Sequence, residues 1–299
     1  MTVEEKTRKG PRLPPWIRIR YSGRSSQDAV NQLVKSNNLH TVCQGAQCPN
    51  QPECFSRGVA TFMILGDTCT RDCRFCAVQS GIPAAVDADE PRRLAEAVVG
   101  LNLRHVVVTS VTRDDLPDGG AGHFAATIRA LRAAMAHVTV EVLTPDFKGV
   151  EGDIDTVLDA VPDVFNHNLE TVRRLQKTIR PAAHYDRSLA VLARAAQRGG
   201  PKTLAKSGLM VGLGETDEEV VEAMTDLRRV GVELLTIGQY LAPSGAHAPV
   251  ERFVTPGQFD EYARRGETMG FRNVASGPMV RSSYMAERQF HAKGGGRCG

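Results

Sequence analysis

The chain of 299 residues lacks a long apolar run, an apolar leader and a strong excess of either charge. No stretch approaches the roughly 18–20 apolar residues that a membrane-spanning helix needs, so we expect no membrane partner. The N-terminus, MTVEEKTRKG, carries charges of both signs with no apolar segment behind it. This start fits neither a secretory signal nor an organelle transit peptide, which predicts a cytoplasmic protein.

The net charge is +3, from 37 basic and 34 acidic residues spread along the chain. So mild an excess argues against a nucleic-acid partner. Hydrophobic residues make up 41% of the chain and charged residues 24%, which is the composition of an ordinary folded domain. A chain of this length can form one large α/β domain or two smaller ones.

Short aliphatic or β-branched segments recur along the chain and predict buried parallel strands. They cover residues 61–65, 106–111, 138–143, 164–168, 207–212 and 234–240. Apolar residues at helical spacing separate most of them, and Thr216 with Glu219 forms a capping-box pattern. Because parallel strands need helix-length crossovers, we expect a sheet with helices outside it. The pattern gives six units of a strand followed by a helix, whereas a full barrel has about eight. The predicted fold is therefore α/β, a partial (β/α)6 TIM-type barrel with N-terminal and C-terminal extensions.

We divide the chain into three predicted segments. Residues 1–58 form an N-terminal extension, with a helix expected over 28–39 and an irregular loop over 41–58. Residues 59–250 form the partial barrel. Residues 251–299 form a helix near 258–269 and a closing tail. In this architecture functional side chains lie at the carboxyl ends of the strands.

Six of the seven cysteines fall within residues 43–76, whereas Cys298 stands next to the last residue and has no clear role. The early triad is Cys43, Cys48 and Cys54, with spacing C-x4-C-x5-C, and the late triad is Cys69, Cys73 and Cys76, with spacing C-x3-C-x2-C. A long chain with its own core and no leader favours metal or redox chemistry over disulfides. Three thiolates can hold three irons of a [4Fe–4S] cube, which leaves one iron for a small molecule. Structural zinc, which usually has four protein ligands, is the alternative.

The late triad follows the first predicted strand, and Phe75 precedes its last cysteine. This arrangement resembles the signature of the radical S-adenosylmethionine superfamily. Residues 208–215, GLMVGLGE, resemble the superfamily's G-x-I-x-G-x-x-E motif, whose backbone lies beside the adenine. The resemblance implies that the late triad holds the [4Fe–4S] cluster that cleaves S-adenosylmethionine. It also implies that Phe75, Gly208, Gly212 and Gly214 contact this cofactor, with glycines permitting close approach of the backbone.

The two triads together with residues 281–284, RSSY, resemble the lipoyl synthases specifically. Residues 109–121, 142–147, 165–171, 206–216 and 277–284 also match, so that the resemblance runs from Trp16 to the tail. In that family the second serine of RSSY completes an auxiliary [4Fe–4S] cluster on the early triad. That serine is Ser283 here, with Ser282 as the fallback. An alkoxide is a poorer ligand for this iron than a thiolate, which suits a cluster meant to be dismantled.

The resemblance implies a reaction, its cofactors and its partners. The cofactors are two [4Fe–4S] clusters and S-adenosyl-L-methionine. A 5′-deoxyadenosyl radical would abstract hydrogen at C6 and C8 of a protein-bound octanoyl-lysine, and the auxiliary cluster would donate the two sulfur atoms. The carrier would be the lipoyl domain of a 2-oxoacid dehydrogenase or the H protein of glycine cleavage. A ferredoxin or flavodoxin reductant and an iron–sulfur cluster carrier are also implied.

Polar residues after the fourth predicted strand are further candidates. Asn166, Asn168 and Glu170 follow this strand, and we expect Asn168 and Glu170 to contact S-adenosylmethionine, although Asn168 could instead cap a helix. His167, between them, is expected to be structural.

An acidic run follows the second predicted strand. Asp114, Asp115 and Asp118 could bind the amino group of S-adenosylmethionine or basic groups of the carrier, or could form a solvated turn. Two rival functions stay open at this point. One is another sulfur-inserting radical enzyme, similar to biotin synthase or to a methylthiotransferase. The other is a non-catalytic iron–sulfur electron carrier.

Overall fold

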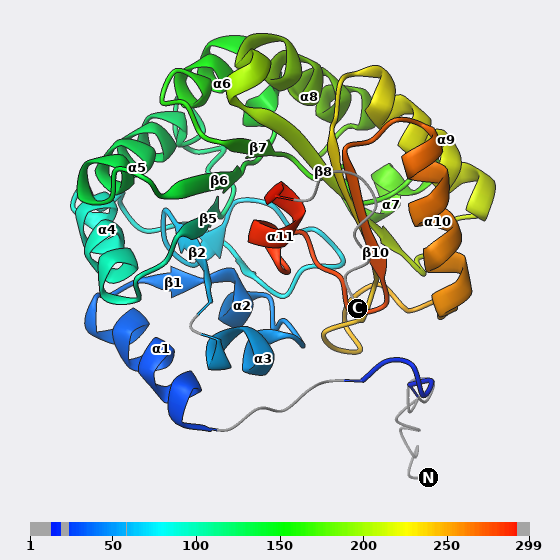
Figure 1. Cartoon of the computed structure of the whole chain (residues 1–299), viewed down its shortest axis with the longest axis horizontal. Helices are drawn as coiled ribbons and strands as arrows, with labels where there is room; N and C mark the ends of the chain where they lie inside the picture. Colours follow the sequence, from blue (N-terminus) through cyan, green and yellow to red (C-terminus); the bar gives the residue numbers. More distant parts are fainter. Residues whose placement is uncertain (1–12, 19–23, 58, 292–299) are drawn as a thin grey trace, which may run out of the picture.

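The computed structural model describes residues 13–18, 24–57 and 59–291, which are built around one curved sheet (Figure 1). Its strands follow the order β1-β2-β5-β6-β7-β8-β9-β10. The parallel strands are β2 (Thr61–Ile64), β5 (His105–Ser110), β6 (Thr139–Leu143), β7 (Val164–Asn166), β8 (Leu204–Val211), β9 (Leu234–Gln239) and β10 (Asn273–Gly277). Within the described residues β10 does not pair back to the first strands. The predicted partial barrel is therefore confirmed.

Helices surround the outer face of the sheet in Figure 1. They are α4 (Glu90–Gly100), α5 (Ala121–Ala134), α6 (Glu151–Leu158), α8 (Tyr185–Gly199), α9 (Asp217–Arg229) and α10 (Pro256–Thr268). Short turns η1 (Phe147–Gly149), η2 (Arg173–Leu175) and η3 (Gly200–Lys202) and the short helix α7 (Gln176–Ile179) complete this layer. Buried aliphatic residues fill the space between helices and strands. No helix in this described part of the chain is long and apolar enough to cross a bilayer.

The six predicted strands are confirmed as β2, β5, β6, β7, β8 and β9, with ends that shift by at most a few residues. The predicted capping box is present at α9, where Thr216 Oγ1 accepts from Glu219 N at 3.3 Å and Glu219 Oε2 accepts from Thr216 N at 2.9 Å. The six predicted strand–helix units are present, and β10 adds a seventh parallel strand beside β9.

The described part of the N-terminal segment contains more helix and strand than predicted. The expected helix is present as α1 (Arg24–Ser36), which begins and ends earlier than the sequence pattern indicated. The predicted irregular loop over 41–58 was wrong, because it contains α2 (Val42–Gly45) and α3 (Gln51–Ser56). In addition, β1 (His40–Thr41) pairs antiparallel with β2. The sheet thus draws strands from all three predicted segments, whose boundaries stay predictions.

The C-terminal segment was predicted as one helix and a tail, and this prediction missed both β10 and α11 (Ala286–His291). Phe290 of α11 packs against Val164, Leu204 and Leu234, which begin β7, β8 and β9. Figure 1 shows α11 in the centre of the ring of strands. The helix therefore covers the amino ends of these strands, and the carboxyl ends form the opposite face.

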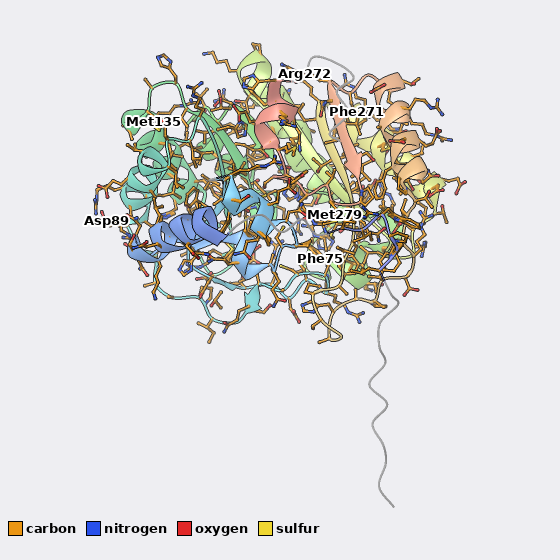
Figure 2. All side chains as sticks on the ribbon, turned by 60° about the horizontal axis from the view of Figure 1, so that its bottom comes forward. Phe75, Asp89, Met135, Phe271, Arg272 and Met279 are labelled. Carbon is orange, nitrogen blue, oxygen red and sulfur yellow. The ribbon has the colours of Figure 1, made fainter. Side chains whose placement is uncertain are left out.

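Figure 2 shows these two ends from the side. Met135 and Phe271, which precede β6 and β10, lie at one end of the strands, and Phe75 and Met279, which follow β2 and β10, lie at the other. The late triad and the residues after β10 thus belong to the carboxyl end, where the architecture predicts the functional residues.

Candidate active site at the carboxyl ends of the strands

The late triad lies on a loop that is fastened to the neighbouring strand. Its first cysteine, Cys69, is in β3 (Thr68–Cys69), which pairs with β4 (Gln79–Ser80). The Cys69 sulfur accepts hydrogen bonds from Arg71 N at 3.4 Å and Thr112 N at 3.3 Å. Thr70 Oγ1 also donates to Thr112 O at 2.9 Å. The residues after β5 therefore hold the loop in place before any cofactor binds.

Arg71 fixes the same loop by pairing with two carboxylates. Its guanidinium donates to both oxygens of Asp114, at 2.7 and 2.9 Å, and to Asp146 Oδ1 at 2.6 Å. The Asp146 side chain is fully buried and also meets Arg187 at 3.2 Å. Burial alone would raise the pKa of Asp146, but the hydrogen bond and charge of Arg71 hold this pKa well below its usual range. Arg71 thus ties the cysteine loop to the ends of β5 and β6.

The three candidate aspartates after β5 have partners within the protein. Asp114 pairs with Arg71, and Asp115 pairs with Arg113 at 2.8 Å. Asp118 accepts hydrogen bonds from the N–H groups of Gly120 and Gly122, both at 2.9 Å. These contacts favour the turn-forming alternative over a role in binding S-adenosylmethionine or the carrier.

Burial raises the pKa of two thiols of the late triad. It raises the pKa of Cys73, and it raises the pKa of Cys76 to about 12 with additional contributions from the charges of Cys73 and Cys69. The charge of Arg180 acts in the opposite direction on Cys73. Because iron binds the thiolate form, a metal would have to displace protons that burial retains here.

Phe75 packs into a small apolar cluster beside the late triad. The cluster contains Ile179, Leu213, Tyr240 and Ala248. Leu213 belongs to the glycine-rich motif, so the structure brings this motif and the aromatic residue of the cysteine loop together. An apolar surface of this kind suits one face of a flat ring.

The glycines of the motif are required by the protein's own atoms. A Cβ at Gly208 would lie 2.8 Å from Asn168 Oδ1, and a Cβ at Gly212 would collide with Gln239 Nε2. Gly212 and Gly214 both have a φ of +101°, which L side chains rarely adopt. Glu215 then fixes the turn, because its carboxylate accepts from Gly212 N at 2.7 Å and Leu213 N at 2.8 Å.

Asn168 and Glu170 lie together at the end of β7. Asn168 Nδ2 donates to Glu170 Oε1 at 3.1 Å, and Asn168 is not the cap of any helix in the described residues. Burial raises the pKa of Glu170, while the charge of Arg180 opposes this shift. Arg180 Nη1 donates to the carbonyls of Asn168 and Leu169, at 3.2 and 3.1 Å. Its Nε is buried without a partner in the described protein.

The early triad lies on the two short helices of the N-terminal segment. Cys43 is in α2 and Cys54 is in α3, and Cys48 N donates to Cys43 O at 3.0 Å in the turn between them. Burial is the main cause that raises the pKa of Cys43 to about 11. Burial, followed by the charges of Cys43 and Cys48, raises the pKa of Cys54 to about 12. These three thiols therefore lie close enough to influence one another.

Residues 278–284, here called the closing segment, lie against the early triad. Asn50 Nδ2, between Cys48 and Cys54 in the chain, donates to Met279 O at 2.6 Å. Tyr284 OH meets both oxygens of Glu53, at 3.3 and 3.4 Å. Burial lowers the pKa of Arg281, and the charge of Cys48 opposes this shift. The residues that flank Ser283 are thus near the early triad.

The donor set fits two iron–sulfur clusters. The six described cysteines are free thiols, three on each side of β2 in the chain, whereas Cys298 lies outside the described residues. Among the described side chains, no group of three or more His, Cys, Asp or Glu closes on a single metal ion. The partnerless Nε of Arg180, beside Glu170 and the late triad, fits an anionic group such as the carboxylate of S-adenosylmethionine.

Sequence reasoning missed two arginines of this site. Arg180 stands among many arginines, and nothing local distinguishes it. A signal for Arg71 did exist, since its position inside the late triad limits it to the vicinity of these cysteines. His167, in contrast, was expected to be structural, and it is buried with hydrogen bonds to Thr144 O and Ser188 Oγ.

Comparisons with known proteins identify the family. Residues 63–227 match the Radical SAM superfamily. The chain is 55% identical over 276 residues to the lipoyl synthase of Caldanaerobacter subterraneus subsp. tengcongensis, covering 92% of this chain and 96% of the relative. It is 53% identical over 286 residues to the lipoyl synthase of Rubrobacter xylanophilus, covering 96% and 88%.

A solved structure shares the fold at low sequence identity. The FeFe-hydrogenase maturase HydG from Carboxydothermus hydrogenoformans superposes with a TM-score of 0.58 and 10% identity, over 90% of this chain and 69% of that one. At such identity the likeness concerns the fold alone. The extent of the sequence matches shows that the chain belongs to the lipoyl synthase family of the Radical SAM superfamily.

Proposed function

We propose that this chain inserts sulfur at C6 and C8 of a protein-bound octanoyl-lysine to form the lipoyl group. Membership of this family implies that the chain uses S-adenosylmethionine and [4Fe–4S] chemistry. The observation that carries the proposal in detail is the pair of free-thiol triads, one at the carboxyl end of β2 and the other against the RSSY segment. An electron carrier needs only one of these sites, whereas sulfur insertion needs a site for cleavage and a site for sulfur.

The late triad would hold the cluster that binds S-adenosylmethionine. When bound, this cluster supplies the electron that cleaves the cofactor and so starts hydrogen-atom abstraction from carbons that no base can deprotonate. Arg180 would bind the carboxylate of the cofactor, and Asn168 with Glu170 would bind its amino or ribose groups. Phe75, Gly208, Gly212 and Gly214 would form the wall against the adenine. The apolar cluster around Phe75 would exclude water there.

The early triad would hold the second cluster, with Ser283 as its fourth ligand. Two observations support Ser283 over Ser282. Tyr284, which directly follows Ser283, meets both carboxylate oxygens of Glu53 beside Cys54 and is influenced by the charge of Cys54. The hydroxyl of Ser282 is already engaged by Asn166 and Asn168, at 2.8 and 2.9 Å.

The octanoylated carrier would approach from the carboxyl ends of the strands. The late triad follows the carboxyl end of β2, and α11 covers the amino ends of β7, β8 and β9. The carrier would be a lipoyl domain of a 2-oxoacid dehydrogenase or the H protein of glycine cleavage. A ferredoxin or flavodoxin would supply electrons, and an iron–sulfur cluster carrier would restore the auxiliary cluster after turnover.

The test is to reconstitute the protein anaerobically and incubate it with octanoylated carrier protein, S-adenosylmethionine and a reductant. The expected result is a carrier whose mass shows two inserted sulfur atoms, together with about two [4Fe–4S] clusters by iron, sulfide and EPR analysis. Cleavage of S-adenosylmethionine without sulfur insertion would contradict the proposed reaction. An unperturbed EPR signal on adding S-adenosylmethionine would instead favour a simple electron carrier.

A further inference from the structure

The hydroxyl of Ser282 is held from both sides inside the barrel. Asn166 Nδ2 donates to Ser282 Oγ at 2.8 Å, and Ser282 Oγ donates to Asn168 Oδ1 at 2.9 Å. A hydroxyl has a single donor hydrogen, so the bond to Asn168 uses it fully. Asn166 and Asn168 alternate along one strand and its extension, which directs both side chains to the same face.

This pair of hydrogen bonds continues into a buried ion pair. Asn166 Nδ2 also lies 3.3 Å from Glu141 Oε1, and Lys206 Nζ donates to the same oxygen at 2.8 Å. Both charged residues are 0% exposed. Removing one partner from a buried ion pair strongly destabilises a fold. The pair of Glu141 and Lys206 therefore gives Asn166 a rigid support.

On its other side, Ser282 reaches the proposed cofactor residues. Asn168, which accepts from Ser282, donates to Glu170 Oε1 at 3.1 Å. A continuous series of hydrogen bonds therefore runs from Lys206 to Glu170, and Ser282 is the only contribution of the closing segment to it among the described residues.

Contacts on either side fix the backbone around Ser283. The Met279 carbonyl accepts from Asn50, and Tyr284 meets Glu53, so both ends of the closing segment rest on α3 and its cap. A Cβ at Gly238 would collide with the Val280 carbonyl, which shows how closely the segment lies on β9. The side chain of Ser283 itself makes no hydrogen bond with any described residue.

We propose that Ser282 is a positioning residue that fixes the closing segment between Asn166 and Asn168 and thereby presents the adjacent Ser283 to the early triad. The part about Ser283 rests on the proposed function. Ser282 would keep the segment in place independently of any ligation by Ser283, because its own hydrogen bonds go to protein atoms only. It also connects the auxiliary site to Asn168 and Glu170 on the S-adenosylmethionine side.

The experiment uses the reconstituted full-length protein and compares Ser282→Ala, Ser282→Thr and Ser283→Ala with wild type. The first readout is hydrogen exchange of residues 278–284 by mass spectrometry. Loss of the two Ser282 hydrogen bonds should make exchange there about tenfold faster in Ser282→Ala. Ser283→Ala should change it less. Unchanged exchange over β8 and α9 checks that each variant is folded.

The second readout is the EPR spectrum of the auxiliary cluster, recorded with the late triad replaced by alanine so that one cluster contributes. Ser282→Ala should shift this spectrum toward that of Ser283→Ala, and Ser282→Thr, which keeps a hydroxyl, should retain the wild-type spectrum. A residue that only stabilised the fold would not produce this pattern. Exchange in Ser282→Ala at the wild-type rate, or a wild-type auxiliary spectrum in that variant, would overturn the proposal.

The two proposals can fail separately. If wild type makes no dithiolated carrier while Ser282→Ala still frees the segment and shifts the spectrum, the proposed reaction is wrong and the positioning role of Ser282 stands. If wild type makes the product and Ser282→Ala behaves as wild type in both readouts, the positioning role is wrong.

Discussion

The buried imidazole of His167 gives a quantitative prediction for the pH dependence of stability. Its Nδ1 lies 2.9 Å from Thr144 O, and its Nε2 lies 3.0 Å from Ser188 Oγ. The carbonyl can only accept, so Nδ1 carries the proton and Nε2 accepts from the serine hydroxyl. Both bonds are satisfied by the neutral ring. Burial, assisted by the positive charge of Arg180, lowers the pKa of His167 from 6.5 to about 4.

The sign follows from proton uptake. Between the two pKa values the unfolded chain binds a proton that the native His167 does not, so stability falls as the pH falls through this window. The shift from 6.5 to about 4 corresponds to about 3 kcal/mol in full. Between about pH 7.5 and about pH 5.5 the expected loss from this one group is about 1 kcal/mol.

The assay is urea unfolding of the metal-free protein under reducing anaerobic conditions, followed by circular dichroism at both pH values. In His167→Asn the amide can still donate to Thr144 O. The free energy of unfolding of this variant should change by about 1 kcal/mol less between the two pH values than that of wild type. Ser188→Ala is the matched control, because it removes one hydrogen bond and keeps the imidazole. It should be less stable at every pH with the wild-type slope. A His167→Asn variant that retained the wild-type slope would show that another group causes the pH dependence.

Three other perturbations have defined outcomes. Asp146→Asn leaves the buried Arg71 with one carboxylate and should lower the free energy of unfolding by about 3–5 kcal/mol in urea titrations; a loss under about 1 kcal/mol would contradict the role of this pair. Gly212→Ala should lower the free energy of unfolding by at least about 1–3 kcal/mol and abolish S-adenosylmethionine binding in equilibrium dialysis. The reason is that alanine is strained at this positive φ and its Cβ would collide with Gln239 Nε2. Gly245→Ala, whose Cβ would meet nothing within 4 Å, is its control and should behave as wild type. Replacing the early triad by alanine should halve the iron and sulfide while cleavage of S-adenosylmethionine persists, and replacing the late triad should halve them and abolish cleavage; a single cluster in wild type would contradict both expectations.

The errors of the sequence interpretation have physical causes. The prolines between the early cysteines indicated an irregular loop. Proline is tolerated in the first turn of a helix, however, and α3 carries one there, since Pro52 is its second residue. β10 has the sequence NVASG, in which only Val274 favours a strand. It forms because β9 offers a parallel edge along its length, which no local pattern reveals.

Features that depend on residues near one another in the chain follow from the sequence alone. The strand alternation and the capping box of α9 were both predicted correctly, because backbone periodicity limits what neighbouring residues can do. The candidate ligands, and their grouping into an early and a late triad, are likewise a property of spacing along the chain.

The partners that support these ligands are distant in the chain, and only the folded arrangement of the barrel reveals them. Ser282 and Asn168 are separated by 114 positions, and Arg71 and Asp146 by 75, yet a hydrogen bond joins the side chains of each pair. The order of strands in the sheet brings these partners together, and each alone is a common polar residue with many possible neighbours. Local sequence therefore fixes what each group is, and packing around the barrel decides what it touches, because most buried polar groups in a folded protein have a hydrogen-bond partner.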